Sequence, residues 1–459
     1  MINMAKKVVI IGGGDAGTYT LEAIFKKGAE VLKQFDITLV KREKGGSASI
    51  CAVPLALQGF FRMKDVTEVD PPETFIGHGI DYRTETEATV INLGNSTVSL
   101  DTGDELNYDS LVIATGRKPR IPDIEGATLK GVYTMSTIED GEKIESAMNT
   151  PEAKNAVVIG GGTIGIQVAV AFSKKGLKTT VVIGHQKPLS SILDPDMGSL
   201  VHEKLAKEGL EFVLGQNVEA ILGDGAEVKA VVVGGKEIPA DIVVISSGML
   251  PNSELAEKAG LELGETGGIV TDQFLHVKKE GKYVSQVYAL GDCVEVLDAI
   301  TLRPRLSQLA STVLVQAKVV ANDLLGGSYS LEPALSPSVA TISDFQVGAV
   351  GITSATAERY GITVISGKKE KPTKARFYAG RKSMAVKLLF DAYSERLIGA
   401  QLISEEMVAD RIDGLYNAIR KGMTAKELSR MEKSFDPCIS LHRDVMVDAM
   451  DNAVVQFKA

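Results

Sequence analysis

The sequence contains no tryptophan, and it has little of three other things: aromatic residues, cysteine and excess positive charge. Aromatic residues make up 5% of the 459 positions, and there are 3 cysteines. So few cysteines cannot form a disulfide-based scaffold, and they indicate a reducing compartment, so we expect a cytoplasmic protein. With 50 basic and 59 acidic residues the formal net charge is -9, which argues against a nucleic-acid partner.

Long hydrophobic runs are also missing. No stretch reaches the ~18 uninterrupted apolar residues that a membrane helix needs, so we expect no membrane partner. Lys6 and Lys7 precede only the short apolar run 8–11 before a glycine cluster, which is too short for the core of a signal peptide. The length is about three times the ~150 residues of a typical domain, which predicts two or three domains.

Glycine, in contrast, is abundant, at 46 residues. Residues 7–17 read Lys-Val-Val-Ile-Ile-Gly-Gly-Gly-Asp-Ala-Gly and precede a stretch of helical character that runs to about Lys27. A short apolar run bounded by glycines predicts a buried parallel strand, and residues 36–40 predict a second strand. Together these segments predict a strand–helix–strand unit.

The same arrangement occurs a second time. Residues 156–165 read Ala-Val-Val-Ile-Gly-Gly-Gly-Thr-Ile-Gly, and residues 179–183 predict the second strand of this copy. Each copy has a further predicted strand that ends in small residues and is followed by a proline, at 108–116 and at 240–248. A whole unit has therefore been duplicated.

From about residue 333 onward the pattern changes. Alternating residues at 383–390 predict an antiparallel sheet, and helical segments are expected near 405–421 and 441–453. The glycine- and proline-containing stretch 326–337 is the expected linker.

The sequence Gly-x-Gly-x-x-Gly between a strand and a helix has a specific physical use. The first glycine allows a tight turn, the second lets the backbone approach a pyrophosphate, and the third lets helix and strand pack closely, while the helix N-terminus faces the anion. Two such sites imply two dinucleotides with electron transfer between them, most economically a resident flavin and a visiting nicotinamide. The Gly291-Asp292 pair, at a predicted strand end, can place a carboxylate against a ribityl or ribose hydroxyl, although such a pair is usually only a turn.

These motifs, in this order, resemble those of the FAD-dependent pyridine nucleotide–disulfide oxidoreductases over essentially the whole chain. The resemblance rests on Gly12-x-Gly14-x-x-Gly17, residues 114–117 (Ala-Thr-Gly-Arg), Gly160-x-Gly162-x-x-Gly165, residues 248–252 (Gly-Met-Leu-Pro-Asn), 267–270 (Gly-Gly-Ile-Val) and 289–293 (Ala-Leu-Gly-Asp-Cys). The segments 351–353, 387–388, 398–401 and 411–413 resemble the dimerisation domain of that family.

The resemblance implies an α/β fold with two doubly wound, Rossmann-like dinucleotide-binding domains and an α+β C-terminal dimerisation domain. It places the FAD-binding domain in 1–118 and 249–328, the NAD(P)H-binding domain in 119–248 and the dimerisation domain in 333–459, and it implies a homodimer. The residues expected to bind FAD are Gly12, Gly14, Asp15, Ala16, Gly17, Lys41, Arg42, Ser49, Ala114, Thr115, Gly116, Gly291 and Asp292. Those expected to bind NAD(P)H are Gly160, Gly162, Thr163, Ile164, Gly165, His185 and Gly248, and no metal site is expected.

Within the family the chain is most similar to the branch with a single redox cysteine: NADH oxidases, NADH peroxidases, coenzyme A-disulfide reductases and persulfide reductases. Cys51 follows Lys41 by ten residues, as in that branch, and positions 46 and 56 are Gly and Ala, so the second cysteine of the dithiol members is missing. Residues 52–57 can start a helix, whose dipole favours the Cys51 thiolate. The alternative is a small buried thiol without a redox role.

The other two cysteines receive different predictions. Cys293 lies in the Gly-Asp-Cys motif and is expected to be a buried structural residue. Cys438 lies in the tail that in relatives reaches across the dimer to the partner's flavin site, so it either resolves an oxidised Cys51 of the other subunit or is an inert interface thiol. His442, four residues on, is a candidate base or a helix cap.

One departure from the family pattern concerns FAD. Lys41 stands where relatives carry an acid that accepts hydrogen bonds from the adenosine ribose, and a lysine cannot accept one. Either Glu43 substitutes, or Lys41 contacts the pyrophosphate region, or ribose binding is weaker than usual. Gln167 and Leu55 replace a glutamate and a lysine that normally pair, which is consistent with a site not built for dithiol chemistry.

A second departure concerns the nicotinamide cofactor. The segment 183–187 contains no acid, so a 2′-phosphate is not repelled, and His185 or Lys187 can pair with it. NADPH use, or use of both cofactors, is therefore open, and the alternative is that these are merely solvated loop residues.

The resemblance implies an FAD-dependent NAD(P)H oxidoreductase that passes electrons through flavin and Cys51 to a small-molecule acceptor. The acceptor is a disulfide, persulfide or polysulfide in one subgroup of relatives, and oxygen or peroxide in another. Two alternatives remain. The first is a reductase of a rubredoxin- or ferredoxin-type electron carrier in which Cys51 is incidental, and the second is a slow-turnover NAD(P)H-binding redox sensor.

Overall fold

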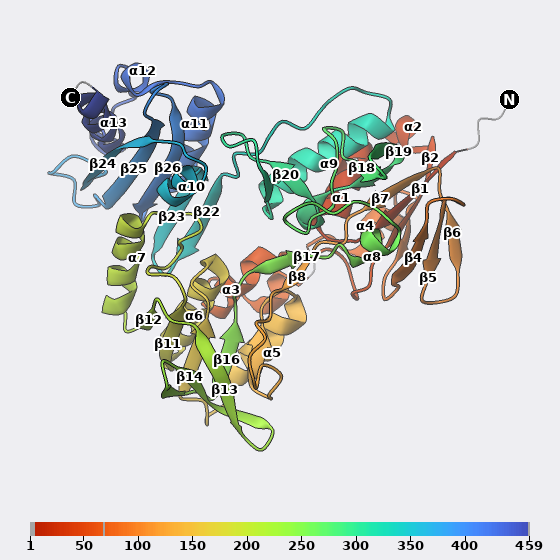
Figure 1. Cartoon of the computed structure of the whole chain (residues 1–459), viewed down its shortest axis with the longest axis horizontal. Coiled ribbons are helices and arrows are strands. Elements are labelled where there is room, and N and C mark those ends of the chain that lie inside the picture. Colours follow the sequence, from red (N-terminus) through yellow and green to blue (C-terminus); the bar gives the residue numbers. More distant parts are fainter. Residues whose placement is uncertain (1–4, 68, 458–459) are drawn as a thin grey trace. The chain divides into compact units, whose positions relative to one another are not determined.

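The computed structural model describes residues 5–67 and 69–457, and the chain divides into two compact units (Figure 1). The first unit comprises Met1–Val53, Arg62–Pro119 and Met249–Ser336. The second comprises Pro54–Phe61, Arg120–Gly248 and Pro337–Ala459. The three domain limits expected from the sequence stay a prediction, because this division groups residues 120–248 with the C-terminal segment.

The first unit is built on a six-stranded sheet. Its order is β18 (His276–Lys279), β19 (Lys282–Ala289), β7 (Ser110–Ile113), β1 (Lys6–Ile11), β2 (Phe35–Val40) and β3 (Asp81–Arg83). Neighbouring strands run parallel except β18 and β19. The apolar run of β1 thus occupies the interior of a parallel sheet, where both faces are buried.

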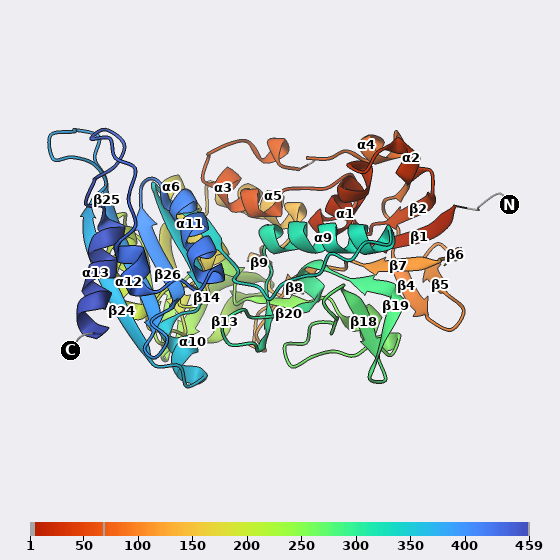
Figure 2. The ribbon, with the colours of Figure 1, turned by 90° about the horizontal axis from the view of Figure 1, so that it is seen from above.

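Alternate side chains of β1 enter two different cores. Val8 and Ile10 pack with α1 (Asp15–Phe25) and α9 (Ala310–Leu324), which lie side by side in both views (Figures 1 and 2). Val9 and Ile11 pack on the opposite face, with residues of the antiparallel sheet β4 (Ala88–Asn92), β5 (Thr97–Leu100) and β6 (Glu105–Asn107).

Short elements complete this part of the chain. The helices are α2 (Ala29–Leu32), α4 (Pro72–Ile76) and α8 (Glu254–Lys258), and the 3-10 turns are η1 (Ile50–Ala52), η2 (Met63–Asp65) and η3 (Gly291–Cys293). The helix α3 (Val53–Leu57) follows η1, and all of it but Val53 is assigned to the second unit. Two strand pairs are β8 (Arg117–Pro119) with β17 (Met249–Pro251), and β20 (Glu295–Leu297) with β21 (Pro304–Leu306).

The second unit begins with a five-stranded sheet that is parallel throughout. Its order is β12 (Glu211–Leu214), β11 (Lys178–Ile183), β10 (Asn155–Ile159), β16 (Ile242–Ile245) and β9 (Val132–Thr134). The helices α5 (Ile138–Met148), α6 (Thr163–Lys175) and α7 (Pro195–Lys207) belong to it, and so does the antiparallel sheet β13 (Val218–Asp224), β14 (Glu227–Val233) and β15 (Lys236–Pro239).

The C-terminal part of this unit is an antiparallel sheet with helices. The strand order is β22 (Ser338–Ile342), β23 (Phe345–Gly351), β26 (Leu397–Ser404), β25 (Ser383–Asp391) and β24 (Val364–Pro372). The helices are α10 (Ser354–Arg359), α11 (Val408–Arg420), α12 (Ala425–Ser429) and α13 (Val445–Phe457). The strand expected at 383–390 and the helices expected near 405–421 and 441–453 are therefore confirmed, and so is the fold class.

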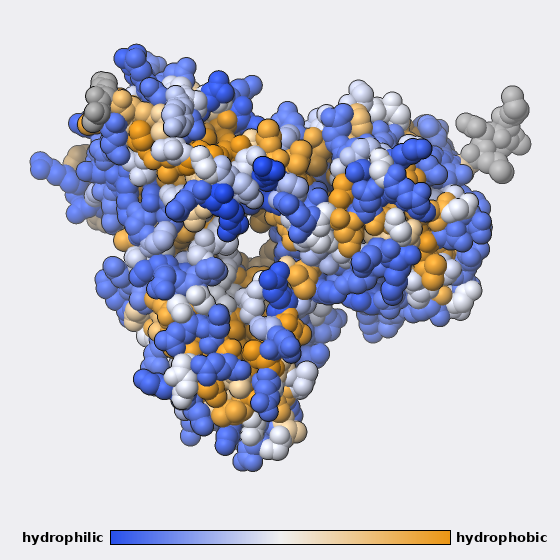
Figure 3. All heavy atoms as spheres, viewed as in Figure 1, coloured by the Kyte–Doolittle hydropathy of each residue, from blue (hydrophilic) through white to orange (hydrophobic). Residues whose placement is uncertain are grey.

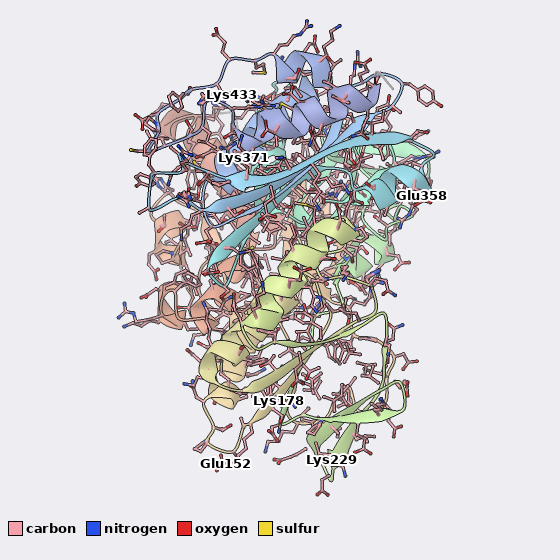
Figure 4. The ribbon with its side chains drawn as sticks, turned by 90° about the vertical axis from the view of Figure 1, so that its left-hand side faces the viewer. Glu152, Lys178, Lys229, Glu358, Lys371 and Lys433 are labelled. Carbon is pink, nitrogen blue, oxygen red and sulfur yellow. The ribbon has the colours of Figure 1, made fainter. Side chains whose placement is uncertain are left out.

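A buried polar cluster joins α7 to the C-terminal sheet of the same unit. Asp194, before α7, accepts a hydrogen bond from the Ser354 backbone N–H at 2.8 Å and pairs with the Lys387 ammonium at 2.8 Å. Burial opposes ionisation of Asp194, but the hydrogen bonds from Lys387 and Ser354 outweigh it and hold the pKa of that carboxyl below its usual range. Figure 4 shows this side of the unit, with Lys178 on β11 and Lys371 on β24 labelled.

Candidate functional site

The first glycine turn joins β1 to α1. Gly12 has φ +118°, and a Cβ atom there would lie 2.0 Å from the carbonyl oxygen of Ala114. A Cβ on Gly17 would lie 2.0 Å from the carbonyl oxygen of Gly12, so the helix packs directly on the turn. A Cβ on Gly14 would meet nothing within 4 Å. The turn therefore has an open side in front of the α1 N-terminus, which fits a pyrophosphate bound by backbone N–H groups.

The second glycine turn, between β10 and α6, repeats this geometry. Gly160 has φ +117°, and a Cβ there would lie 2.1 Å from the carbonyl oxygen of Ser246. Gly165 packs on Gly160 in the same way, Gly162 faces open space, and α6 starts at Thr163 and Ile164. Each turn thus fits one dinucleotide, as the sequence predicts, although the individual binding residues stay predictions.

The strand end after β7 lies against the first turn. Ala114 donates its backbone N–H to the Ile11 carbonyl at 2.8 Å. Thr115 donates its hydroxyl to the Asn252 carbonyl at 2.6 Å, and the Asn252 amide donates back to the Thr115 carbonyl at 2.9 Å. Gly116 follows with φ +71°, which turns the chain toward Arg117. These contacts fix the position of the Arg117 backbone.

Arg117 pairs with Asp292 across the site. Its Nε lies 3.3 Å from Asp292 Oδ2, and Gln308 bridges the two residues by accepting from Arg117 at 3.2 Å and donating to the Asp292 carbonyl at 3.3 Å. Burial raises the pKa of Asp292, while Arg117 lowers it. A half-buried carboxylate with this one cationic neighbour is suited to accept hydrogen bonds from cofactor hydroxyls, as the expected flavin-side role of Asp292 requires.

Gly291 and Ala16 bring this pair next to α1. The Gly291 N–H donates to Gln316 Oε1 at 2.8 Å, and a Cβ on Gly291 would lie 2.9 Å from the Ala16 Cβ. Asp15, beside Ala16, has its pKa raised by burial and by the carboxylates of Asp292 and Asp70, while Arg117 lowers it. The first site therefore gathers several acids around one arginine.

Cys51 lies in η1 and its side chain is exposed. Burial by the surrounding protein is nevertheless the largest influence on its ionisation: it raises the pKa of the thiol, Arg117 lowers it, and Asp15 and Asp292 raise it. The favourable effect of a helix dipole on the thiolate stays a prediction. The helix after Cys51, α3, has 5 residues, and Cys51 precedes it in a 3-10 turn.

The segment that carries Cys51 is hydrogen-bonded to Val66, Val69 and Asp70. The Ser47 N–H donates to the Asp70 carbonyl at 3.0 Å, the Ser47 hydroxyl donates to Asp70 Oδ2 at 2.8 Å, and Val69 N–H donates to the Ser47 carbonyl at 2.8 Å. Ser49 donates its N–H to the Val66 carbonyl at 3.1 Å. The cysteine thus follows a segment that is fixed by backbone hydrogen bonds.

Lys41, at the end of β2, is buried, and its ammonium donates to the carbonyl oxygens of Gly45, at 3.3 Å, and Gly46. Arg42 is exposed and pairs with Glu43 at 3.2 Å, so Glu43 already has a cationic partner. The structure thus gives Lys41 a role that the sequence did not suggest: its ammonium donates hydrogen bonds to its own loop. The three alternatives for binding the adenosine ribose stay open.

The loop after β11 lacks such a buried charge. His185 and Gln186 are exposed and Lys187 is half-buried. Gly215 donates its N–H to the His185 carbonyl at 3.0 Å, and Gly248 follows β16 with φ +107°. No carboxylate lies within residues 183–187, so this part of the second site stays compatible with a 2′-phosphate.

Gln167 is buried in α6, with its side-chain amide donating to the Thr341 carbonyl at 2.9 Å. Its backbone carbonyl accepts from Gln58 at 3.0 Å. The neutral Gln167 side chain therefore finds a hydrogen-bond acceptor in the backbone. It needs no charged partner, in agreement with an uncharged residue at position 55. Leu55, in α3, is half-buried.

The two other cysteines and His442 have different surroundings. Cys293 is fully buried and its thiol contacts the Leu290 carbonyl at 3.2 Å, in agreement with a structural residue. Cys438 is exposed, and His442 packs edge-on against Phe435 at 5.3 Å between ring centroids. Cys438 and His442 lie in the second unit, so their proposed roles toward Cys51 stay predictions.

Sequence reasoning gave no role to Arg117 or Asp70. Arg117 stands in the quoted Ala-Thr-Gly-Arg motif, so its position next to a cofactor turn was a usable signal. Asp70 carried no signal, because its contacts with Ser47 join segments that only the tertiary fold brings together.

Two loops of the C-terminal part, between β24 and β25 and between α12 and α13, carry apolar side chains at the surface. Figure 3 shows hydrophobic residues gathered over this part of the chain, with hydrophilic residues around them. The exposed large apolar side chains here include Phe377, Met431, Phe435 and Ile439. Exposed apolar patches of this kind mark interaction surfaces. Among residues 5–67 and 69–457, no helix is long and apolar enough to cross a membrane, and no cluster of metal ligands occurs.

Comparison with known proteins places the chain in a family. Residues 6–313 match the pyridine nucleotide-disulphide oxidoreductase family, and residues 337–444 match its dimerisation domain. The chain is 34% identical over 453 residues to an NADH oxidase of Methanocaldococcus jannaschii, with 98% of each chain covered. It is 30% identical over 437 residues to an NAD(P)H coenzyme A polysulfide/persulfide reductase of Pyrococcus horikoshii, with 95% of each covered.

A solved structure is similar over nearly the whole chain. It is that of an NAD-dependent persulfide reductase from A. fulgidus, with a TM-score of 0.93 and 33% identity, covering 98% of this chain and 83% of the other. These matches agree with the two glycine turns and the antiparallel C-terminal sheet. The chain therefore belongs to the pyridine nucleotide-disulphide oxidoreductase family, and it is an FAD-dependent NAD(P)H oxidoreductase of the disulfide reductase/NADH oxidase type.

Proposed function

We propose that this oxidoreductase reduces a sulfur-containing small molecule, a disulfide, persulfide or polysulfide, through Cys51. The observation that carries the proposal is the exposed Cys51 on a segment fixed by hydrogen bonds, in the electrostatic field of Arg117. An exposed thiol with a nearby cation can react with an incoming sulfur atom, whereas a structural thiol is typically buried. Relatives named as persulfide reductases, at 30% and 33% identity, support this choice.

In this scheme FAD, when bound, supplies the chemistry that takes a hydride from NAD(P)H and passes on two electrons. The residues of the two glycine turns bind the two pyrophosphates, and Asp292 accepts from flavin-side hydroxyls. The Cys51 thiolate attacks one sulfur of the acceptor, a new S–S bond forms to Cys51, and the other sulfur leaves as a thiol or hydrosulfide after taking a proton. The two electrons from NAD(P)H then cleave the S–S bond of the Cys51 mixed disulfide or persulfide, which restores the thiolate and releases the second sulfur as a thiol or hydrosulfide after it takes a proton.

The experiment that tests this proposal is the Cys51→Ser variant. NAD(P)H should still reduce the flavin in this variant under anaerobic conditions, whereas turnover with disulfide, persulfide and polysulfide should fall at least ~100-fold. Titration of the unchanged enzyme with NADH and NADPH should develop a long-wavelength thiolate–flavin band that C51S lacks. Unchanged turnover of C51S with every sulfur acceptor would overturn the proposal and favour a carrier-protein reductase.

A second candidate acceptor is oxygen or peroxide, which the 34% identity to an NADH oxidase favours. In that case two electrons from NAD(P)H first convert oxygen to hydrogen peroxide. The Cys51 thiolate attacks one peroxide oxygen, the O–O bond breaks with release of hydroxide, and a sulfenic acid forms. Two further electrons and a proton reduce the sulfenic acid to thiolate with release of water. Comparing NAD(P)H consumption in air, with added peroxide, and anaerobically with each sulfur acceptor ranks the two candidates.

Two finer properties belong to the same proposal. The exposed apolar side chains in the C-terminal loops and the match to a dimerisation domain support a homodimer, which sedimentation at micromolar concentration tests. The acid-free loop 183–187 supports use of NADPH as well as NADH.

Cys438→Ser tests the role of the Cys438 thiol. A loss of turnover would support a role of Cys438 in resolving the oxidised Cys51, and unchanged turnover would leave Cys438 an inert thiol.

A further inference from the structure

Lys41 is a buried cation placed beside the first glycine turn. It follows β2, its side chain is 7% exposed, and its ammonium donates to the carbonyl oxygens of Gly45 and Gly46. A buried ammonium needs hydrogen-bond acceptors, and here it takes them from its own loop four and five residues on. The Lys41 ammonium thus fixes the backbone at Gly45 and Gly46.

The aliphatic part of the Lys41 side chain is also closely packed. A Cβ on Gly13 would lie 2.7 Å from Lys41 Cδ and 3.0 Å from the Tyr82 hydroxyl oxygen, so the lysine fills the space that a side chain at position 13 would take. The backbone of Lys41 donates to the Arg83 carbonyl at 2.8 Å. Lys41 therefore connects the cofactor turn directly to the loop at 45–46.

The opposite side of that loop is fixed by a different part of the chain. A Cβ on Gly46 would lie 1.9 Å from the Asp70 carbonyl oxygen, and Ser47 exchanges hydrogen bonds with Asp70 and Val69. The loop is thus held between the Lys41 ammonium and the segment 69–70. Cys51 follows four residues after Ser47.

We propose that Lys41 is a positioning residue for the redox cysteine: its ammonium fixes Gly45 and Gly46, and through them the segment that carries Cys51. The proposal rests on the proposed redox function of Cys51. Gly45 and Gly46 have no side chains of their own to pack, and Gly45 has φ +73°, so the loop depends on external contacts for its conformation. A displacement of about 1 Å in a reacting group can lower a rate by about 100-fold.

The test compares Lys41→Met with Lys41→Arg in the holoenzyme. Methionine keeps an apolar stem of similar length and removes the donors, whereas arginine keeps donors for both carbonyls. Lys26→Met is the matched control, because Lys26 lies on the surface at the end of α1 and its ammonium pairs with Glu22, at 3.7 Å. Lys41→Gln, with a shorter donor, is the second variant in case K41M does not fold.

The first readout is hydrogen–deuterium exchange of peptides covering 42–52. K41M should exchange there at least about tenfold faster, with peptides of β1 unchanged, and K26M should match the unchanged enzyme. The second readout is the rate of iodoacetamide modification of Cys51 as a function of pH, measured by mass spectrometry. K41M should change this profile and K41R should restore it.

The third readout is turnover with a sulfur acceptor. In K41M kcat should fall about tenfold or more while the KM for NAD(P)H changes less than about threefold, because the second glycine turn is untouched. Loss of FAD with an unchanged exchange rate at 42–52 would overturn the proposal, since Lys41 would then act on the cofactor. Faster exchange over the whole first unit would also overturn it, as a general loss of stability.

The outcome for C51S separates this inference from the proposed function. If C51S keeps full turnover, the proposed function fails, and faster exchange at 42–52 in K41M then shows that Lys41 fixes a loop without a redox role. If C51S is inactive but K41M retains both the exchange rate and kcat, the proposed function stands and the positioning role of Lys41 is wrong.

Discussion

The two glycine turns of this enzyme have almost the same backbone and different surroundings. A Cβ on Gly12 would lie 2.0 Å from the carbonyl of the strand alongside, and a Cβ on Gly160 would lie 2.1 Å from its counterpart. Both fingerprint strands lie between equivalent neighbours in their sheets, β2 and β7 in one and β11 and β16 in the other. Duplication has therefore kept the turn that fits a pyrophosphate.

The loops after the second strands, β2 and β11, differ in burial and charge. After β2 the chain carries the buried Lys41, and the ionisable groups Asp15, Arg117, Asp292 and Cys51 influence one another beside the first turn. After β11 it carries the exposed His185 and Gln186. A site with many buried contacts suits a cofactor that stays, and an exposed, lightly charged loop suits one that comes and goes.

The largest expected effect comes from Gly12→Ala compared with Gly160→Ala. Each adds a Cβ that collides with a carbonyl at positive φ, at a cost of about 1–3 kcal/mol or more. G12A should be purified with less than about a tenth of the normal flavin, by its visible absorbance. G160A should keep its flavin and lose rapid reduction by NAD(P)H.

The matched control is Gly225→Ala, in the turn between β13 and β14, where the added Cβ meets nothing within 4 Å. It should lower the free energy of unfolding by only about 1 kcal/mol and leave both cofactors bound. Equal flavin loss in G12A and G160A would break the comparison between a resident and a visiting cofactor.

His185→Glu tests the second turn alone. A carboxylate in this loop should repel a 2′-phosphate, so kcat/KM for NADPH should fall about tenfold while that for NADH changes less than about threefold. Steady-state kinetics with both cofactors measures this, and His185→Gln is the neutral control. A parallel loss with both cofactors would mean that His185 does not discriminate between them.

Arg117→Gln tests the electrostatics of the first turn. Burial raises the pKa of Cys51 and Arg117 opposes this, so removing the cation should raise that pKa further and slow iodoacetamide modification of Cys51 severalfold at about pH 7.5. The neighbouring Lys118→Gln is the control, since Lys118 pairs with Glu254 at the surface. Equal modification rates in R117Q and the unchanged protein would show that Arg117 does not influence the ionisation of Cys51.

The smallest expected effect is that of Asp15→Asn, in the opposite direction. Asp15 raises the pKa of Cys51 and contributes less than Arg117, so D15N should shift the pH profile of Cys51 modification slightly downward. Because thiolate is the reacting form, modification at about pH 7.5 becomes faster when the pKa falls. Glu22→Gln, an acid farther along α1, should leave the profile unchanged.

The sequence allowed prediction of those features that depend on local pattern. The apolar runs bounded by glycines predicted β1 and β10, and the spacing of glycines predicted the tight turns that follow them. The local pattern does not show the groups that influence the ionisation of Cys51, because these are burial and residues such as Arg117 that are distant in sequence. The contacts of Lys41 with its own loop and of Ser47 with Asp70 depend on the conformation of glycine loops. The residue types in such loops do not indicate which atoms come into contact, so the sequence could not predict these contacts.

The first unit is discontinuous, and this has a consequence for how the protein is made. The sheet around the second glycine turn is complete once β16 has been synthesised, at Ile245. The sheet around the first turn still lacks β19, and Asp292 comes after it in the chain. On the ribosome, domains fold as their segments emerge. The sheet around the second glycine turn can therefore form on a nascent chain in which the sheet around the first turn is still incomplete, and a cofactor that needs Asp292 can be captured only late in biosynthesis.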